Sequence, residues 1–190
     1  MRGDVEGVVG WQNLRDHNAR DHYNDWVNDI FYGGAGAGWY WTDHHKTVID
    51  FGAGTRGDTY SYRDVVVGGV PTIEPLRRRT QQTSLAIGQH YQFFRNQWFH
   101  PHVGAGLDFA RRSIVEEYQP VLIFDNASRT TRTVSVERTE RNTDFLARPF
   151  VETGFKAYMT RKAFFTSNAR VLFKSGFDEV LFRFGFGVDF

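Results

Sequence analysis

The last eleven residues of the chain, 180–190, alternate between two kinds of side chain. Every even position carries valine or phenylalanine, whereas the odd positions after Leu181 carry Arg183, Gly185, Gly187 and Asp189. A period of two places successive side chains on opposite faces of a β-strand, and a helix does not produce it. Soluble half-buried strands usually alternate over roughly 4–8 residues, whereas a strand that crosses a membrane needs about 9–11. The C-terminus therefore predicts a membrane-spanning β-strand.

Seven segments upstream show similar alternation, less sharply in the first two, and with the last strand they predict eight spanning strands. They are 4–12, 30–41, 47–58, 84–94, 101–112, 147–159 and 163–174. The connections 42–46, 95–98 and 160–162 are short, whereas 13–25, 63–80 and 113–141 are long. Short turns at one end and long loops at the other are typical of outer-membrane barrels, and only the short connection at 175–178 departs from this pattern. The prediction for residues 1–190 is a single all-β domain, an eight-stranded antiparallel up-and-down transmembrane barrel with short periplasmic turns and longer extracellular loops.

The composition of the chain excludes several kinds of site and partner. The chain has no cysteine, which excludes disulfides, thiolate nucleophiles and cysteine-based zinc sites. Its formal net charge of +1 gives no electrostatic reason to expect a nucleic-acid partner. No run of about 18 or more apolar residues is present, so a transmembrane helix is not expected. The N-terminal Met1-Arg2-Gly3-Asp4 lacks the apolar stretch of a secretory signal, so the barrel prediction requires that a signal was removed, replaced or left out.

Charged residues of both signs fall on the polar faces of these strands in nearly equal numbers. On the apolar faces only Arg111 is charged, at the end of a strand where it can reach lipid headgroups. A lipid-facing Arg or Lys costs roughly 2–4 kcal/mol at the bilayer midplane, so this exclusion is expected of a membrane barrel. Because side chains fill the interior of an eight-stranded barrel, we predict a packed lumen closed by ion pairs and no open pore. The predicted network comprises Asp50, Arg56, Asp108, Arg112, Arg148, Glu152, Lys156, Arg170, Glu179, Arg183 and Asp189.

The end of the chain resembles a known family. The stretch 148–159 (RPFVETGFKAYM), the pair Phe164-Phe165 and the closing FGFGVDF at 184–190 are similar to the last three strands of small eight-stranded outer-membrane barrels. That group includes the transmembrane domain of outer-membrane protein A and the opacity-type surface antigens. The resemblance implies location in the bacterial outer membrane, contact with its lipid and lipopolysaccharide, and assembly by the barrel-assembly machinery. It also implies a C-terminal assembly signal formed by Phe184, Phe186, Val188 and Phe190. With no periplasmic domain after Phe190, a peptidoglycan-anchoring role is not implied.

The histidines suggest possible chemistry. His44, His45, His90, His100 and His102 fall near the short-turn end and, with Asp108, can be drawn as a metal or acid–base cluster. No spacing matches a zinc signature, so we favour imidazoles that act as hydrogen-bonding fillers, with no metal and no cofactor.

A lipid-modifying enzyme of the outer membrane offers another comparison. Ser167-Asn168 loosely resembles the His-x-Ser-Asn pattern of lipid A deacylases, but Phe165 stands where the histidine would be. The serine would lack its base, so we expect no catalytic residues.

Arginines in the predicted loops are candidates for outside contacts. Arg77, Arg78, Arg79, Arg132 and Arg138 can pair with lipopolysaccharide phosphates or with a protein, because guanidinium matches phosphate bidentately. A solvated loop with scattered charge is the alternative. Alternation within 131–139 also predicts a hairpin that extends above the membrane and offers a surface for a protein partner.

The leading functional hypothesis is a non-enzymatic outer-membrane scaffold, anchor or surface-binding module that acts through its loops, with a subunit role in a larger cell-envelope assembly as one form of it. One alternative is a lipid-modifying enzyme that uses His90, His102 or Asp108. Another is a narrow channel or small-molecule carrier, which the charged lumen disfavours. A soluble sandwich or lipocalin-like carrier remains if the membrane assignment is wrong, because such proteins also alternate.

Overall fold

A computed structural model describes residues 2–14, 29–67, 69–93, 98–125, 129–174 and 177–190. Eight antiparallel strands close into a barrel with the ring order β1-β10-β9-β8-β5-β4-β3-β2. Their bounds are β1 Arg2–Leu14, β2 Asp29–Tyr40, β3 His45–Val67, β4 Val70–Gln92, β5 Phe99–Tyr118, β8 Arg138–Tyr158, β9 Ala163–Phe173 and β10 Phe177–Asp189. β6 (Val121–Asp125) and β7 (Thr130–Ser135) form a separate two-stranded sheet. The predicted eight-stranded antiparallel barrel is confirmed. Among the described residues there is no helix with the length and apolarity needed to cross a membrane.

The two faces of the barrel strands separate as the alternation predicted. Inward positions such as Asp50 and Arg183 are almost completely buried, whereas outward neighbours such as Phe51 and Phe184 are about half exposed or more. The ring closes between β1 and β10, where Gly3 and Phe190 exchange backbone hydrogen bonds of 2.9 and 3.0 Å. Closure joins the first and last strands of the chain, so each ring strand is paired on both sides over part of its length, as a sheet in hydrocarbon requires.

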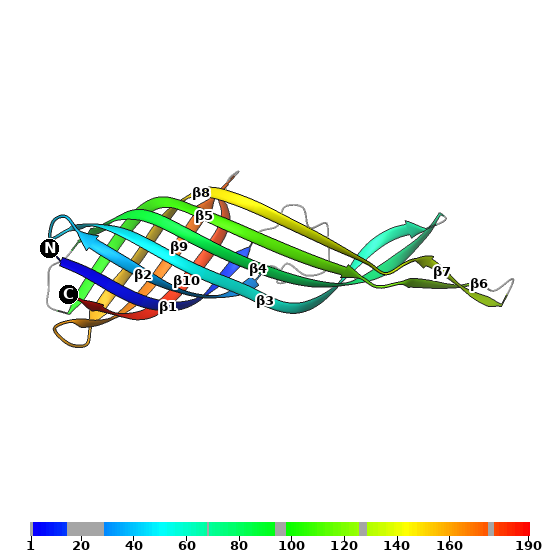
Figure 1. Ribbon diagram of the computed structural model, residues 1–190, viewed down its shortest axis with the longest axis horizontal. Coiled ribbons are helices and arrows are strands. Elements are labelled where there is room, and N and C mark those ends of the chain that lie inside the picture. Colours follow the sequence, from blue (N-terminus) through cyan, green and yellow to red (C-terminus); the bar gives the residue numbers. More distant parts are fainter. Residues whose placement is uncertain (1, 15–28, 68, 94–97, 126–128, 175–176) are drawn as a thin grey trace.

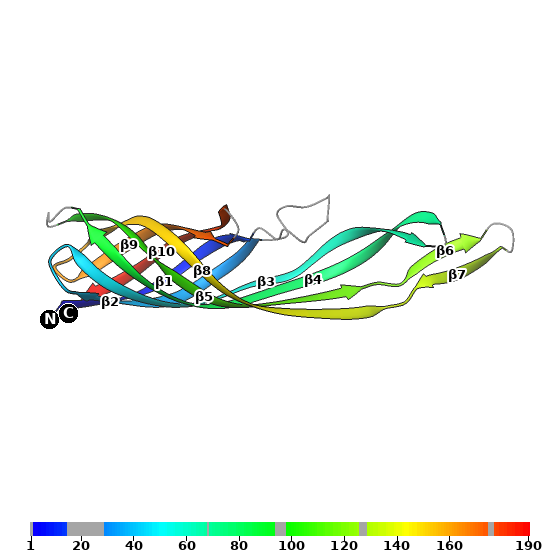
Figure 2. The same ribbon diagram turned by 90° about the horizontal axis from the view of Figure 1, so that it is seen from above.

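Four of the eight strands are much longer than a membrane span requires. β3, β4, β5 and β8 contain 20 to 23 residues, whereas β1, β2, β9 and β10 contain 11 to 13. Figures 1 and 2 show the long strands continuing past the barrel, away from the chain termini, to end in two separate hairpins. We call residues 57–80 and 113–143 the arm, and the remaining parts of the ring strands the barrel wall.

The arm corrects the prediction of long loops at 63–80 and 113–141. Residues 70–80 belong to β4 and pair with β3, and the chain turns at Gly69, whose φ of 84° suits glycine. Residues 113–118 continue β5, and β8 already begins at Arg138. Pro71 and Pro75 suggested a loop, but both lie where β4 pairs with β3 alone, because its pairing with β5 starts only at Leu76. Proline is tolerated in such a one-sided strand. The predicted loop at 13–25 lies largely outside the described residues.

A β-bulge marks the base of the arm. The register between β3 and β4 shifts between Arg56 and Thr59, so one extra residue stands in β3. Before the bulge the even positions of β3 face the lumen, whereas beyond it the even residues Tyr60 and Tyr62 are more than half exposed. A bulge re-aims side chains in this way and increases the local twist.

Candidate functional site

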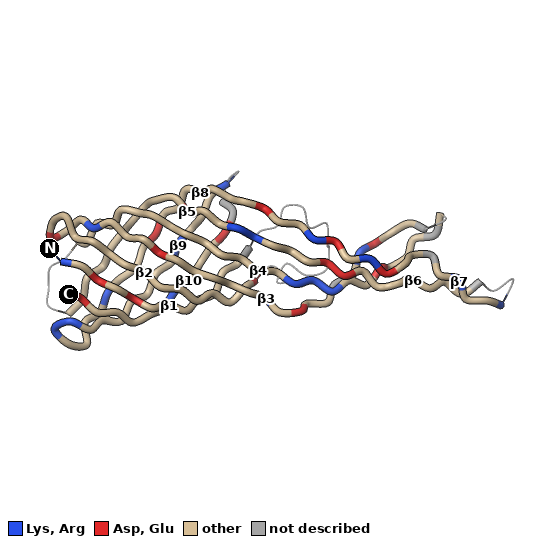
Figure 3. Tube along the Cα trace, in the orientation of Figure 1, with Lys and Arg blue, Asp and Glu red and all other residues tan. Residues whose placement is uncertain are grey.

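The lumen contains three compact groups of charge, each with two acids and two bases, and Figure 3 shows both signs along the barrel. The three groups follow one another from the turn end of the barrel toward the arm. Each has one residue on β8 and one on β10, at positions 156 and 189, then 152 and 183, then 148 and 179. The turn-side cluster is Asp4, Lys46, Lys156 and Asp189. The central cluster is Asp50, Glu152, Arg170 and Arg183. The arm-side cluster is Asp108, Arg112, Arg148 and Glu179.

The central cluster is a closed square of alternating charge. Arg183 donates to Asp50 Oδ2 at 2.8 Å and to Glu152 Oε2 at 2.7 Å. Arg170 bridges the same two acids, with its Nε 2.6 Å from Glu152 Oε2 and its Nη2 donating to Asp50. All four side chains are at most 4 % exposed. Removing one partner from such a buried group would leave an uncompensated charge, which costs roughly 3–5 kcal/mol.

The arm-side cluster has the same composition with amides added. Arg148 is fully buried and reaches Asp108 at 2.7 Å and Glu179 at 2.6 Å. Gln12 donates to Glu179 at 2.7 Å, and Gln82 accepts from Arg112 at 3.0 Å. Five strands (β1, β4, β5, β8 and β10) therefore contribute to one buried polar network.

The turn-side cluster contains residues that the predicted network omitted. Asp4 accepts from Lys46 at 2.9 Å and from Lys156, whose Nζ also lies 3.3 Å from Asp189. Asp4 is the first residue of the predicted strand 4–12, but Lys46 was assigned to the connection 42–46 and is instead the second residue of β3. Arg56 lies at the other end of the lumen, where its Nη1 donates to the backbone oxygen of Asp29 at 3.1 Å.

An apolar layer separates the central from the arm-side cluster. It comprises Val8, Tyr32, Ala86, Phe150, Leu172 and Leu181. Tyr32 lies directly over Gly52, where a Cβ atom would stand 1.8 Å from the tyrosine hydroxyl. At the turn end the lumen opens into a cavity of about 1040 Å³ whose lining includes Tyr40, Gln92 and His100.

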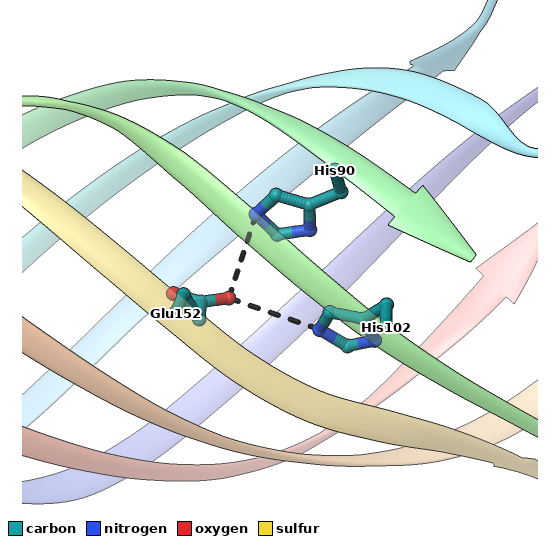
Figure 4. Close-up of side chains that lie close together, drawn as sticks. All are labelled: His90, His102 and Glu152. Atoms are coloured by element: carbon teal, nitrogen blue, oxygen red, sulfur yellow. Dashed lines mark ion pairs between the residues drawn. The ribbon is translucent and has the colours of Figure 1, made fainter. Parts of the chain in front are cut away.

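Two buried histidines face the central cluster. His90 on β4 and His102 on β5 have ring centroids 5.0 Å apart and nearly parallel rings. Their Nε2 atoms lie 3.6 and 3.9 Å from Glu152 Oε1, and Figure 4 shows both rings directed at this oxygen. All four imidazole nitrogens and Glu152 Oε1 lack a hydrogen-bond partner among the described residues. Each unpaired buried polar group costs about 1–3 kcal/mol.

The structure thus changes the histidine cluster considered from the sequence. Asp108 does not join it, since this acid pairs with Arg148, and Glu152 takes the place next to the histidines. His44 and His45 lie at the β2–β3 turn, where both contact the Tyr91 ring. The buried side chains His90, His102 and Glu152 are the group in the described chain that could hold a metal ion, because their donor atoms all lie within 4.8 Å of one another.

The arginines predicted to contact outside molecules lie on the arm, and most already contact carboxylates of the chain. Arg77 and Arg79 both donate to Asp58, which stands at the bulge, and Arg77 also reaches Glu117. Arg78 lies 3.5 Å from Glu116. These pairings reduce the positive charge that the arm offers to lipopolysaccharide phosphates. Arg132 is exposed on β7.

A group of hydrogen bonds joins β4 of the arm to the end of β7 and the start of β8. Arg138 donates to both oxygens of Glu74, at 2.6 and 2.9 Å, and Ser135 donates to the same carboxylate at 2.7 Å. The Arg138 guanidinium also stacks over the Tyr118 ring at 4.0 Å. Desolvation raises the pKa of Glu74, but the hydrogen bonds from Arg138 and Ser135 outweigh it and hold this pKa below its ordinary value. Burial and the hydrogen bond to Glu116 raise the pKa of Tyr118 to about 12.

Apolar side chains are exposed on the arm as well as on the barrel wall. The largest are Tyr60, Tyr62, Val66, Ile73, Leu122, Phe124 and Val136, each more than half exposed. They are distributed over both hairpins of the arm. On the barrel wall, the predicted assembly signal Phe184, Phe186, Val188 and Phe190 forms an outward row that is 46 to 70 % exposed. Its role as an assembly signal stays a prediction.

Comparison with known proteins identifies a fold and no closer relationship. No protein-family model and no curated protein matches the sequence. Among solved structures, the chain superposes on the N-terminal β-barrel domain of Pseudomonas aeruginosa OprF with a TM-score of 0.54 and 15% identity, covering 98% of this chain and 97% of that one. The attachment invasion locus protein Ail of Yersinia pestis gives 0.57 at 9% identity, with both chains fully covered. Neisserial surface protein A gives 0.52 at 11%, covering 99% and 94%. The chain therefore has the fold of small outer-membrane β-barrels, as its C-terminal pattern predicted.

Proposed function

We propose that the protein is a non-enzymatic integral protein of the bacterial outer membrane, in which the barrel anchors an arm that binds a protein partner at the cell surface. The barrel wall supports the location, because its outward side chains are mostly apolar and, among those described, Arg111 is the one charged residue. Its guanidinium lies 6.0 Å from the Phe145 ring, at the end of the wall nearest the arm. The fold shared with outer-membrane proteins supports the same location.

The observation that carries the proposal is the difference in strand length within one ring. A spanning strand needs about 9–11 residues, so about half of β3 and β4 and a smaller part of β5 and β8 lies beyond the bilayer. Strands that only anchored a protein would not need this extension. The three balanced clusters and the apolar layer in the lumen favour a non-conducting anchor over a channel.

The arm offers two kinds of contact to a protein. Beyond the barrel, the outer edges of β3 and β8 have no strand partner among the described residues, because the pairing of β2 with β3 ends at Thr55 and that of β8 with β9 starts at Phe150. Unpaired edges accept an added strand. The exposed tyrosines Tyr60 and Tyr62, next to the edge of β3, would give side-chain specificity to such a contact.

Location can be tested without knowing the partner. The native protein should fractionate with the outer membrane, require detergent for extraction and migrate faster on a gel when unheated, as closed membrane barrels do. Intact cells treated with protease should lose the arm and keep a protected barrel fragment. Extraction without detergent would contradict the proposed location.

Binding can be tested by photo-cross-linking in cells. A photoreactive amino acid at Tyr60, Tyr62 or Phe124 of the arm should give a discrete protein adduct, and the same group at Ile49 of the barrel wall is the matched control. Ile49 is also exposed, at 50 %, but its side chain lies on the outward face of the barrel wall and not on the arm. A photoreactive group there should therefore cross-link to lipid. Protein adducts confined to Ile49, or none at any arm position, would refute the surface-binding role.

A further inference from the structure

The histidine pair in the lumen is not explained by the anchoring role. His90 and His102 are 4 % and 3 % exposed, and both nitrogens of each ring lack a hydrogen-bond partner in the described part of the chain. Their distances of 3.6 and 3.9 Å to Glu152 Oε1 are longer than those of good hydrogen bonds. A hydrogen-bonding filler would have satisfied at least one nitrogen per ring, so the arrangement points to a ligand between the three side chains.

The spacing suits a metal ion. With metal–ligand bonds of 2.0–2.2 Å, two ligand atoms of a tetrahedral zinc site stand about 3.3–3.5 Å apart. The two observed nitrogen–oxygen separations exceed this by only a few tenths of an ångström, and all three donors lie within 4.8 Å of one another. Two imidazoles and one carboxylate form a donor set that zinc and its neighbours in the periodic table accept. We propose that His90, His102 and Glu152 form a binding site for a divalent transition-metal ion inside the barrel.

The surrounding charge permits a cation there. Arg170 and Arg183 contact Glu152 through Oε2, which leaves Oε1 directed at the histidines. The central cluster is neutral by itself, since its two arginines balance Asp50 and Glu152. Glu6 also faces this part of the lumen and has no ion pair among the described residues, while Lys46, opposite His90 in the strand register, is paired with Asp4. The neutral form of imidazole is the one that binds metals.

A path to the site leads from the turn end. The cavity there is lined by Gln92 and His100, and each of these is one inward position away from the histidine of its own strand. An ion that enters this cavity passes Gln92, His100 and the turn-side cluster before it reaches His90 and His102. The apolar layer on the other side, which includes Phe150 and Leu181, closes the route toward the arm.

Zinc titration of the full-length chain tests the proposal. The protein is purified in detergent, stripped with a chelator, and titrated with Zn²⁺ alone by calorimetry. We expect one tight site per chain, and we expect His90→Asn and His102→Asn each to weaken it by roughly 100-fold or more, since even outer-shell changes cost about 10–100-fold. The controls are His100→Asn at the cavity and His45→Asn at the turn, which should leave the tight site unchanged.

The fold of each variant is checked by its heat-modifiable migration. A second measurement covers variants that do not fold: the wild-type chain loaded with Co²⁺ should show the intense visible absorption of a four- or five-coordinate site. The proposal is overturned if Zn²⁺ does not bind tightly. It is also overturned if the His100→Asn or His45→Asn control abolishes binding as strongly as His90→Asn, or if Co²⁺ shows only the weak spectrum of a six-coordinate surface ion.

Discussion

The arm continues four of the eight strands of the barrel wall, but the two regions place their side chains in different ways. In the barrel nearly all charges face inward and are buried, as with Arg148 at 0 % exposure, while the outward residues are mostly apolar. In the arm, arginine–carboxylate pairs such as Arg77–Asp58 lie at the surface, about one-third exposed. Exposed apolar side chains occur in both regions. The difference shows that the medium around a strand, rather than its backbone, decides which types of side chain each face of the strand presents.

The largest effect is expected from removing a buried charge of the barrel. Arg148→Ala leaves Asp108 and Glu179 without their shared partner in the arm-side cluster, so the free energy of unfolding should fall by roughly 3–5 kcal/mol. Arg79→Ala, at an arm arginine that is 47 % exposed, should change it by less than about 0.5 kcal/mol. Urea unfolding of both variants in the same detergent or lipid measures the contrast. Equal losses would mean that the lumen clusters are not the stabilising element we describe.

A matched isoleucine pair tests the assignment of the medium itself. Ile49 of the barrel wall and Ile73 of the arm are 50 % and 56 % exposed. Ile49→Arg should cost up to about 2–4 kcal/mol if that face meets lipid, because the guanidinium must then be buried in hydrocarbon. Ile73→Arg should cost almost nothing, since that position meets water. Unfolding in lipid vesicles provides the measurement, and a similar cost at both positions would contradict the boundary drawn at the bulge.

Two glycines on β3 probe the packing on either side of that boundary. A Cβ at Gly52 would clash with Tyr32, whereas a Cβ at Gly57 would meet nothing within 4 Å. Gly52→Ala should therefore destabilise the barrel by about 1–3 kcal/mol, the usual cost of overpacking, and Gly57→Ala should be close to neutral. Midpoints of urea unfolding compare the two. A neutral Gly52→Ala would show that the lumen has room to adjust.

The smallest effect is a response of the arm to acid. Because the folded-state pKa of Glu74 lies below its ordinary value of 4.5, the Glu74–Arg138 pair contributes stability above that pH and loses it as the pH falls through the lower folded value. Amide protection factors of β4 and β7 in the arm should fall between pH 5 and the acid limit, as measured by hydrogen exchange corrected for intrinsic rates. Glu74→Gln should abolish the change. A persistent pH response in that variant would assign it to other groups, Asp58 among them.

The barrel could be predicted from sequence because the membrane imposes a rule on every spanning strand. Phe182, Phe184 and Phe186 cannot exchange places with Arg183 without moving charge into lipid, so the alternation had to be strict. The same rule marked Asp50, Glu152 and Arg170 as inward residues. Which acid meets which base was not predictable, since this depends on the stagger of strands that are distant in the chain.

Apart from the hairpin predicted at 131–139, the arm escaped prediction because its outer face carries polar and charged side chains as well as apolar ones. Residues 70–80 carry prolines and three consecutive arginines, and nothing forces such a strand to alternate. The histidine site escaped for another reason. His102 and Asp108 are close in sequence, but the register of β5 against β8 pairs Gly104 with Glu152 and Asp108 with Arg148. Only this register shows that Glu152, rather than Asp108, stands beside the histidines.

The unbroken course of β4 and β5 from the barrel into the arm has a mechanical consequence. Antiparallel hydrogen bonds run perpendicular to their strands, so a pull on the arm along its length shears many of them at once instead of opening them one by one. A load at the distal hairpins is thereby passed directly into the closed ring, whose β4–β5 ladder extends from Leu76–Tyr118 to Gln92–His102. The bulge between Arg56 and Thr59 interrupts the neighbouring β3–β4 ladder, so the first yielding under tension is expected there, at the junction, while the ring stays intact.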